Sequence, residues 1–237
     1  MALLSESKKS FLNPLVHRCI GCGSRIGSSR GRFCSWCLIR MYPDGRRPVG
    51  DIQVLTGFFH SGVMREMILR FKFGGERHLG KELARLALES WAETPSIGDF
   101  LIPVPVSRKR FRERGYNQAA LLARAISRET GAAFENPLVR SGGESQIRVS
   151  GAERAENIRG KFSLSPGTVY KGRVWLIDDV MTTGATIAEV LSTLSDAGIH
   201  RVQPGVVCFR KISEESIIQS NMTSVESQEV DHGETGN

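Results

Sequence analysis

The chain has 237 residues, of which 40% are hydrophobic and 24% charged, which is typical of a soluble protein with a buried core. No run of residues approaches the roughly 18 apolar positions of a membrane-spanning helix, and the first residues lack the basic and apolar segments of a secretory signal. We therefore expect a cytoplasmic protein without membrane insertion. The net charge is +7, and the last 27 residues contribute −5, which leaves +12 on the rest. A body this basic indicates a polyanionic partner, either nucleic acid or a densely phosphorylated small molecule.

Four of the five cysteines form two CxxC pairs separated by eleven residues: Cys19, Cys22, Cys34 and Cys37. This spacing is typical of a four-cysteine zinc ribbon, in which two tight turns bring four thiolates to one ion. A redox pair or an iron–sulfur centre is the alternative for such a set. Because four thiolates leave no open coordination position, we expect the zinc to be structural and to take no part in chemistry.

After the cysteine segment, short strands alternate with amphipathic helices. Pro43, Asp44, Gly45 and Pro48 predict a linker out of the first module. The pattern of apolar residues then predicts strands at 51–60, 100–106, 173–180 and 201–209, and helices at 63–73, 78–93, 116–130 and 185–198. Residues 141–150 are polar and glycine-rich and predict a loop.

This alternation is typical of an α/β domain with a mainly parallel sheet flanked by helices. The tail is acidic and lacks aromatic residues, so we expect it to be disordered. We therefore predict three parts: a small four-cysteine zinc ribbon (1–47), an α/β domain (48–210) and a disordered acidic tail (211–237).

The strongest functional signal is VWLIDDVMTTGAT, residues 174–186, in which a hydrophobic strand leads into Asp178 and Asp179 and then into a turn that begins a helix. In open α/β sheets, ligands bind beyond the carboxyl ends of the strands, where this turn lies. Hydroxyls and backbone N–H groups at a helix N-terminus suit a phosphate, and paired carboxylates suit the vicinal hydroxyls of a ribose. The segment therefore predicts a ribose 5-phosphate site, with the phosphate held by Thr182, Thr183, Gly184, Ala185 and Thr186.

Segment 174–186 resembles the phosphoribosyl pyrophosphate (PRPP) signature of the type I phosphoribosyltransferases. The block PVPVSRKRFRERGYNQ, residues 103–118, resembles the ComF family in particular, whose members also carry an N-terminal zinc module with four cysteine ligands. A third block resembles the family at Gln146, Arg154, Asn157 and Phe162, and the likeness extends over most of residues 19–210. The resemblance implies a type I phosphoribosyltransferase-like fold that binds PRPP with Mg²⁺. It also implies a pentosyltransferase reaction, in which a phosphoribosyl group passes to an unidentified acceptor and pyrophosphate leaves.

The resemblance also assigns roles to charged residues. Asp178 and Asp179 would act in catalysis by stabilising positive charge on the ribose ring. Four cations of the basic block would hold the pyrophosphate: Arg108, Lys109, Arg110 and Arg114. The alternative for this block is a solvated loop with a charged face.

Two further functions remain open. The ComF family name refers to competence, so the resemblance also implies a non-enzymatic factor that binds single-stranded DNA during DNA uptake. The arginines of the zinc module, with Phe33 and Trp36, would then contact phosphates and bases; otherwise Phe33 and Trp36 pack the core of the module. A sensor that binds PRPP or a nucleotide without turnover is the other alternative. The histidines His60, His78 and His200 are expected to be structural, and Cys208 is expected to be a buried apolar residue.

Overall fold

The computed structural model describes residues 17–26, 32–140 and 160–211, and the chain divides into two compact units, Met1–Arg40 and Met41–Asn237. The small unit contains an antiparallel strand pair and a short helix: β1 (His17–Arg18), β2 (Arg25–Ile26) and α1 (Ser35–Leu38). Cys19 and Cys22 lie between the two strands, whereas Cys34 is the N-cap residue of α1 and Cys37 lies within it. The two CxxC pairs therefore occupy a turn and a helix start.

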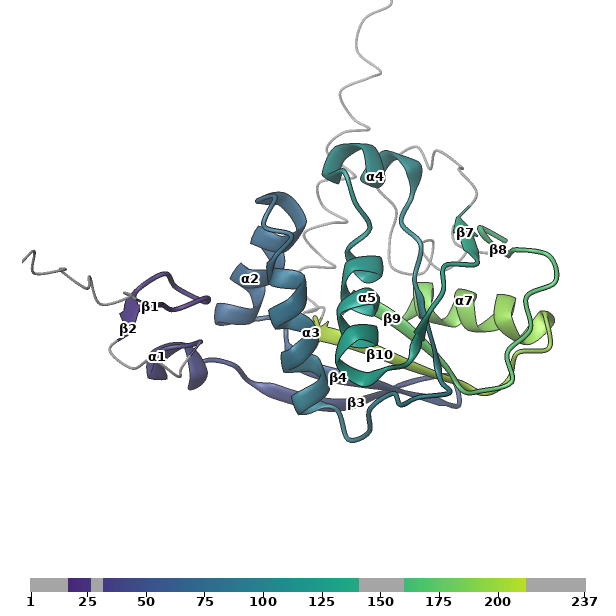
Figure 1. The fold of residues 1–237 in the computed structure, drawn as a ribbon, viewed down its shortest axis with the longest axis horizontal. Coiled ribbons are helices and arrows are strands. Elements are labelled where there is room, and N and C mark those ends of the chain that lie inside the picture. The colour runs from purple at the N-terminus through teal and green to yellow at the C-terminus, as the bar shows by residue number, and fades with distance from the viewer. Residues whose placement is uncertain (1–16, 27–31, 141–159, 212–237) are drawn as a thin grey trace, which may run out of the picture. The chain divides into compact units, whose positions relative to one another are not determined.

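The large unit is built on a six-stranded sheet with the order β3-β4-β10-β9-β5-β6 (Figure 1). Its strands are β3 (Pro43–Val49), β4 (Ile52–Phe59), β5 (Phe100–Pro103), β6 (Ala133–Phe134), β9 (Val174–Met181) and β10 (Val202–Phe209). Strand β3 runs antiparallel to β4, and all other neighbours are parallel. A separate antiparallel pair is formed by β7 (Leu138–Arg140) and β8 (Phe162–Leu164). The mainly parallel sheet, its helices and the preceding four-cysteine cluster confirm the fold class predicted from the sequence.

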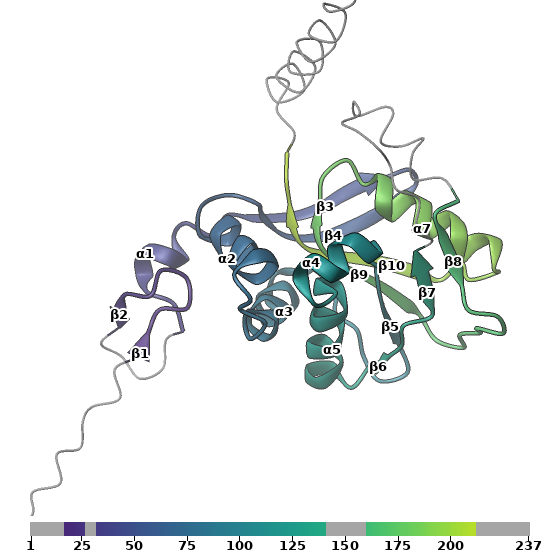
Figure 2. The same ribbon diagram turned by 90° about the horizontal axis from the view of Figure 1, so that it is seen from above.

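Helices cover both faces of this sheet (Figure 2). Helices α3 (Leu79–Ser90) and α5 (Gln118–Thr130) lie on one face, with α2 (Gly62–Phe73) beside α3, and α7 (Ala185–Asp196) lies on the other. Alternate side chains of β9 point to opposite faces of the sheet. Val174 and Leu176 belong to the apolar cluster that contains the buried residues of α7, whereas Trp175 stacks on Trp91 with ring centroids 6.2 Å apart. Strand β9 is therefore buried on both faces.

Two sequence predictions are wrong. The residues expected to form a linker make strand β3, where Pro43 pairs with Phe58 and Pro48 with Gln53. Proline is tolerated there because β3 is at the edge of the sheet, so a missing N–H removes no ladder bond on its open side. The basic block, for which a solvated loop was the alternative to a pyrophosphate site, forms helix α4 (Arg108–Arg114), so the loop alternative is wrong. Its start and stop signals are local: Ser107 accepts a hydrogen bond from Arg110 N, and Gly115 ends the helix with φ of 75°.

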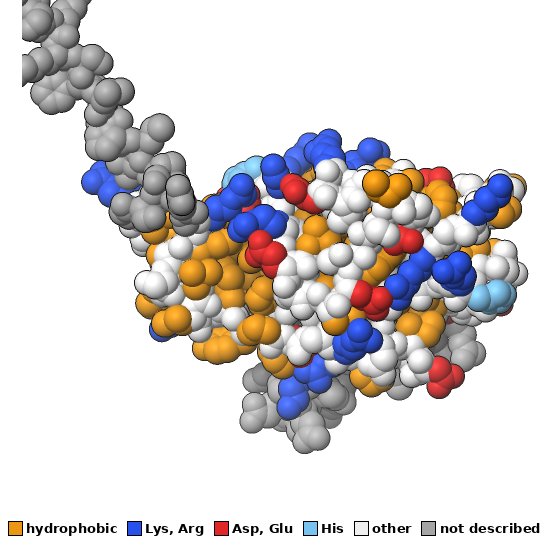
Figure 3. Space-filling view, turned by 60° about the horizontal axis from the view of Figure 1, so that its bottom comes forward, with side chains coloured by type: hydrophobic (Ala, Val, Ile, Leu, Met, Phe, Trp, Pro, Cys, Tyr) orange, Lys and Arg blue, Asp and Glu red, His pale blue; other side chains and the backbone are white. Residues whose placement is uncertain are grey.

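Among the described helices, none is long and apolar enough to cross a membrane. On the face that Figure 3 shows, acidic and basic side chains lie next to one another across the middle of the view. A group of Lys and Arg side chains also lies along the upper edge of the same view.

Candidate functional site

A cavity of about 720 Å³ lies at the carboxyl ends of the parallel strands. Its wall includes residues that directly follow three neighbouring strands: His60 after β4, Arg210 after β10 and Thr182 after β9. These three residues lie close together because β10 lies between β4 and β9 and pairs with both in parallel register. Helices α2, α5 and α7 and the α4 corner complete the wall.

The two acids of β9 lie in this cavity but differ in their surroundings. Asp179 is 6% exposed, and Lys72 Nζ of α2 lies 2.9 Å from its Oδ1. Asp178 accepts a hydrogen bond from the backbone N–H of Asp179 at 2.8 Å. Desolvation raises the pKa of Asp178 to about 7, the neighbouring Asp179 carboxylate adds to this rise, and Lys72 opposes it. Asp178 is therefore poised between its neutral and charged forms near neutral pH.

All five turn residues predicted to hold a phosphate line the cavity at the N-terminus of α7: Thr182, Thr183, Gly184, Ala185 and Thr186. Gly184 is the N-cap residue of α7 and supplies no side-chain cap, although Thr183 Oγ1 accepts from Ala185 N at 3.3 Å. The first-turn N–H groups are thus largely left for another acceptor, and the helix dipole favours an anion there. Gly184 has φ of +78°, and a Cβ on it would lie 2.5 Å from Val49 Cγ2, so a larger residue would disturb this turn.

Helix α4 separates the predicted pyrophosphate residues into two pairs. Arg110 and Arg114 line the cavity, whereas Arg108 and Lys109 are exposed and do not belong to its wall. Positions 110 and 114 are one helical turn apart and share a face, whereas 108 and 109 face elsewhere. The structure therefore brings two of the four cations to the acids.

Four further cations line the cavity that the site prediction left out: Lys72, Arg140, Lys161 and Arg210. Gln146, Arg154 and Asn157, which the family resemblance also covers, lie outside the described residues. Phe162, from the third block of the family resemblance, is buried, and the guanidinium of Arg140 lies 5.3 Å from its ring centroid. The sequence could have placed Arg210 at this cavity, because the residue directly follows a strand that runs parallel to β9.

His60 also lines the cavity. Desolvation lowers the pKa of His60, and the positive charge of Lys72 adds to this effect. Its imidazole is therefore neutral at pH 7 and adds no positive charge. Cys208 is fully buried, as predicted.

The four cysteines of the small unit meet as one cluster, with their Sγ atoms all within 4.8 Å of one another. A tetrahedral zinc with Zn–S bonds of about 2.3 Å requires Sγ atoms about 3.8 Å apart, and Cys22 and Cys34 lie at 3.7 Å. None of these cysteines forms a disulfide. Cys34 N donates to Cys19 Sγ at 3.2 Å, as expected beside a metal-binding thiolate. The donor set and its spacing thus fit a zinc ion.

The aromatic residues of the small unit do not both pack its core. Phe33 is 7% exposed, but Trp36 is 49% exposed, and the guanidinium of Arg40 lies 4.0 Å from its ring centroid. The exposed ring and its cation leave a surface on which a planar group can stack.

Comparisons with known proteins give relatives but no matching family model. The chain is similar to Competence protein F of Haemophilus influenzae, with 31% identity over 223 residues that cover 81% of this chain and 97% of that protein. It is 28% identical to Competence protein ComFC of Bacillus subtilis over 203 residues, which cover 79% and 82% of the two chains. It is 29% identical to DNA utilization protein YhgH of Salmonella typhi over 149 residues, or 60% and 65%. Among solved structures, adenine phosphoribosyltransferase of Leishmania tarentolae is 16% identical with a TM-score of 0.38, covering 74% of this chain and 98% of that one.

Proposed function

The chain belongs to the ComF family of competence proteins, and from that premise we propose that it binds PRPP with Mg²⁺ and transfers the phosphoribosyl group to an acceptor. One observation carries the proposal: paired carboxylates, an uncapped helix N-terminus and a set of cations line the same cavity. Each of the three matches a different part of PRPP.

The carboxylates match the ribose diol. Asp178 and Asp179 are the carboxylates in the described wall of the cavity, and carboxylates accept hydrogen bonds from hydroxyls but repel phosphates. The turn at 182–186 follows two residues after them along the chain. A ribose with its hydroxyls on the acids can therefore place its 5-phosphate at the start of α7, where backbone N–H groups and hydroxyls can donate to it.

The cations match the 1-pyrophosphate. Arg110 and Arg114 lie beyond β5, the strand next to β9, so they flank the acids on one side. In the proposed reaction an acceptor nitrogen bonds to the anomeric carbon while the bond from that carbon to pyrophosphate breaks, and the leaving group takes the electron pair. The cations and the Mg²⁺ that PRPP carries would stabilise this leaving group. The carboxylates would stabilise positive charge on the ring.

The small unit would hold one structural zinc ion through Cys19, Cys22, Cys34 and Cys37. The fit of the four sulfur atoms supports this role, and the closed donor set provides no position for a substrate.

Thermal unfolding with and without Mg²⁺–PRPP tests the binding step. A saturating ligand at a hundred times Kd should stabilise the protein by about 2.7 kcal/mol. No shift in the unfolding temperature would contradict the proposal. Pyrophosphate release, assayed over a panel of bases and amines, then separates a transferase from a PRPP sensor, since a sensor binds PRPP but releases none.

A second candidate function is binding of single-stranded DNA through the small unit, which the exposed Trp36 with its neighbour Arg40 favours. Stacking of one base on an aromatic side chain is worth about 1–3 kcal/mol. Trp36→Ala should therefore weaken single-stranded DNA binding at least about 5-fold, and binding should fall steeply with salt. Ile39→Ala is the matched control, because Ile39 is 71% exposed in the same unit but cannot stack. Equal losses in the two variants would contradict a stacking role.

A further inference from the structure

The cavity wall has two sides, because residues that follow different strands lie on opposite sides of the acid pair. In the sheet, β5 lies on one side of β9, whereas β10 and then β4 lie on the other. Arg110 and Arg114, which the proposed function assigns to the pyrophosphate, follow β5. His60 follows β4 and Arg210 follows β10, so these two residues line the opposite side.

The chemistry of the proposed transfer places the acceptor on that opposite side. A nucleophile approaches the reacting carbon in line with the bond that breaks, from the face opposite the leaving group. The acceptor nitrogen gives its lone pair to the new bond with the anomeric carbon, and pyrophosphate leaves with the electron pair of the broken C–O bond. The proton of the nitrogen passes to water. Because the pyrophosphate is assigned to the β5 side, the acceptor lies toward β10 and β4.

The side toward β10 carries a guanidinium that no acid of the described chain neutralises. Arg210 forms no ion pair within residues 17–26, 32–140 and 160–211. Its backbone N–H donates to Met181 O at 2.8 Å, which ties the end of β10 to the end of β9. Burial lowers the pKa of His60, and the positive charges of Lys72 and Arg210 lower it further. His60 is therefore a neutral ring near an unpaired guanidinium.

An apolar side chain borders the same region. Leu69 of α2 lines the cavity and is partly buried. Arg65, Leu69 and Lys72 are four and three residues apart and so share one face of the helix. The charges of Arg65 and Lys72 both act on His60, which indicates that this face of α2 is turned toward the histidine. An apolar contact with a few polar groups is typical of a site for a small organic ligand.

We propose that Arg210 binds a carboxylate of the acceptor, so that the acceptor is a nitrogen heterocycle that carries an acidic group. The inference rests on the proposed function, since it names the class of the second substrate at the same site. A guanidinium and a carboxylate form two parallel charge-assisted hydrogen bonds, which orient the acceptor as well as bind it. The neutral imidazole of His60 can exchange a hydrogen bond with the heterocycle, and Leu69 can pack against it.

Two pairs of nucleotides test this assignment, because the base of a product nucleotide occupies the place of the acceptor. Orotidine 5′-monophosphate differs from uridine 5′-monophosphate only by a carboxylate. Nicotinate mononucleotide has a carboxylate where nicotinamide mononucleotide has an amide. Calorimetric titration should give at least about 10-fold tighter binding of the acid in one or both pairs, as expected for a charge-assisted hydrogen bond.

Variants at the two ends of β10 show whether Arg210 causes this preference. Arg210→Gln should reduce the ratio of the two Kd values to less than about 2-fold, whereas Arg210→Lys should keep part of it, because lysine retains the charge but not the planar donors. Arg201→Gln is the matched control. Arg201 is exposed just before β10 and does not line the cavity, so the ratio should stay as in the unaltered protein.

The outcomes separate the inference from the proposed function. Equal binding of the acid and its partner in both pairs by the unaltered protein would overturn the acidic acceptor. A preference that persists in Arg210→Gln, or that Arg201→Gln removes as well, would overturn the role of Arg210, as would an equal loss of both members of a pair in Arg210→Gln. If ribose 5-phosphate binds but none of the nucleotides does, the inference fails and the ribose assignment stands. If ribose 5-phosphate does not bind, the proposed function fails and the inference fails with it.

Discussion

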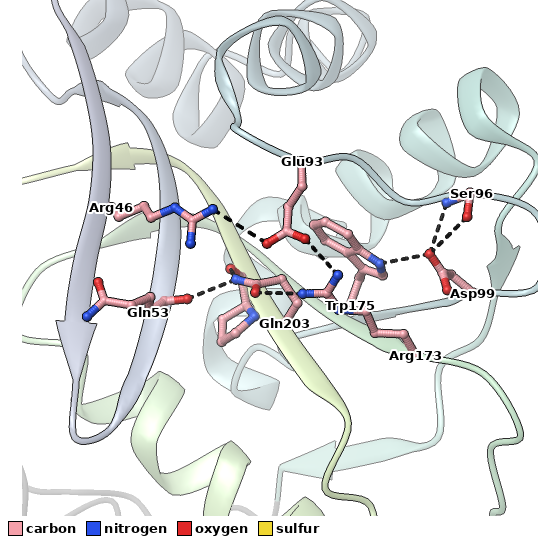
Figure 4. A network of polar contacts seen from close by, with 9 residues as sticks. Arg46, Gln53, Glu93, Ser96, Asp99, Arg173, Trp175 and Gln203 are labelled. Atoms are coloured by element: carbon pink, nitrogen blue, oxygen red, sulfur yellow. Dashed lines mark hydrogen bonds and ion pairs between the residues drawn. The ribbon is translucent and has the colours of Figure 1, made fainter.

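Polar side chains are paired differently at the two ends of the parallel sheet. At the amino ends, a network joins residues from separate elements (Figure 4). Arg173 Nη1 lies 2.7 Å from Glu93 Oε2, and Arg173 Nη2 donates to Gln203 Oε1 at 2.9 Å. Gln203 Nε2 donates to Gln53 O at 2.8 Å, so both ends of this amide are used. Trp175 Nε1, nearby on β9, donates to an Asp99 carboxylate oxygen at 3.1 Å.

At the carboxyl ends, groups of like charge lie close together instead. Asp178 has a raised pKa because burial and the neighbouring Asp179 carboxylate disfavour its charge. Cations of the wall also come close together, since the positive charge of Arg110 adds to the effect of burial in lowering the pKa of Arg140. The comparison teaches that one end of the sheet completes its hydrogen bonds within the chain, whereas the other keeps like charges close together around a cavity. Charged and polar groups held in unfavourable surroundings are typical of binding sites.

The largest expected effect comes from removing both charges of the acid pair. Asp178→Asn with Asp179→Asn should weaken PRPP binding more than about 100-fold, because the diol loses two charged acceptors. The fold should persist, since the change removes two neighbouring like charges and asparagine matches aspartate in size, although Lys72 loses its carboxylate partner. Titration calorimetry measures the affinity, and far-UV circular dichroism with zinc content checks the fold. Normal PRPP affinity in the folded double variant would contradict the ribose assignment.

The amino end should respond in stability rather than in affinity. Gln203→Leu removes the contacts to Arg173 and to the Gln53 carbonyl, so the free energy of unfolding should fall by about 2 kcal/mol. PRPP affinity should stay within about 2-fold, because Gln203 does not line the cavity. The matched control is Gln53→Leu, which keeps the backbone carbonyl and alters only an exposed side chain, at a cost below about 0.5 kcal/mol. Urea unfolding measures the free energy of unfolding of both variants, and similar losses of stability in both would argue against the network.

Helix α4 offers a paired test of which cations belong to the cavity. Arg110→Ala should weaken PRPP binding about 10-fold, the loss expected for one charge-assisted hydrogen bond. Arg108→Ala removes an equal charge two residues away and outside the wall, so binding should change less than about 2-fold at physiological salt. Equal effects would indicate that only the net charge of α4 matters.

A further expected effect is a pH dependence of stability. Asp178 has a native pKa of about 7, above its value in the unfolded chain, so its native form binds a proton more readily. Its contribution to stability is present below about pH 4 and is lost as the pH rises toward about 7. The unfolding free energy of Asp178→Asn relative to the unaltered protein should therefore increase between about pH 4 and 7 and level off above. If the difference in unfolding free energy between the two proteins, measured with urea, does not change with pH, the pKa of Asp178 is not raised.

The sequence predicted the parts of the fold and site whose signals are local. The strand, acids and turn of 174–186 lie together in the chain, and the four cysteines have a fixed spacing, so both clusters could be anticipated. Strand β3 was missed because Pro43 and Gly45 suggest a break, and only pairing with β4 makes this segment a strand. Helix α4 was missed although its Ser107 and Gly115 boundaries are typical helix signals.

The remaining wall of the cavity depends on the order of the strands, which no local pattern contains. Lys72, Arg140, Lys161 and Arg210 come from separate segments and meet only because the sheet and its helices bring them there. Side-chain directions on α4 likewise decide that Arg110 faces the cavity and Arg108 does not. The three-dimensional arrangement therefore decides which cations of the basic run face the cavity.

A crystal structure with ribose 5-phosphate is the most direct test of the central claim, that a phosphorylated ribose binds where β9 leads into α7. We predict the phosphate at the 182–186 turn and the two ring hydroxyls on Asp178 and Asp179, with Lys72 displaced from or shared with the bound sugar. A sugar phosphate bound elsewhere, or a complex in which the Asp179–Lys72 pair and the turn remain without ligand, would contradict the account.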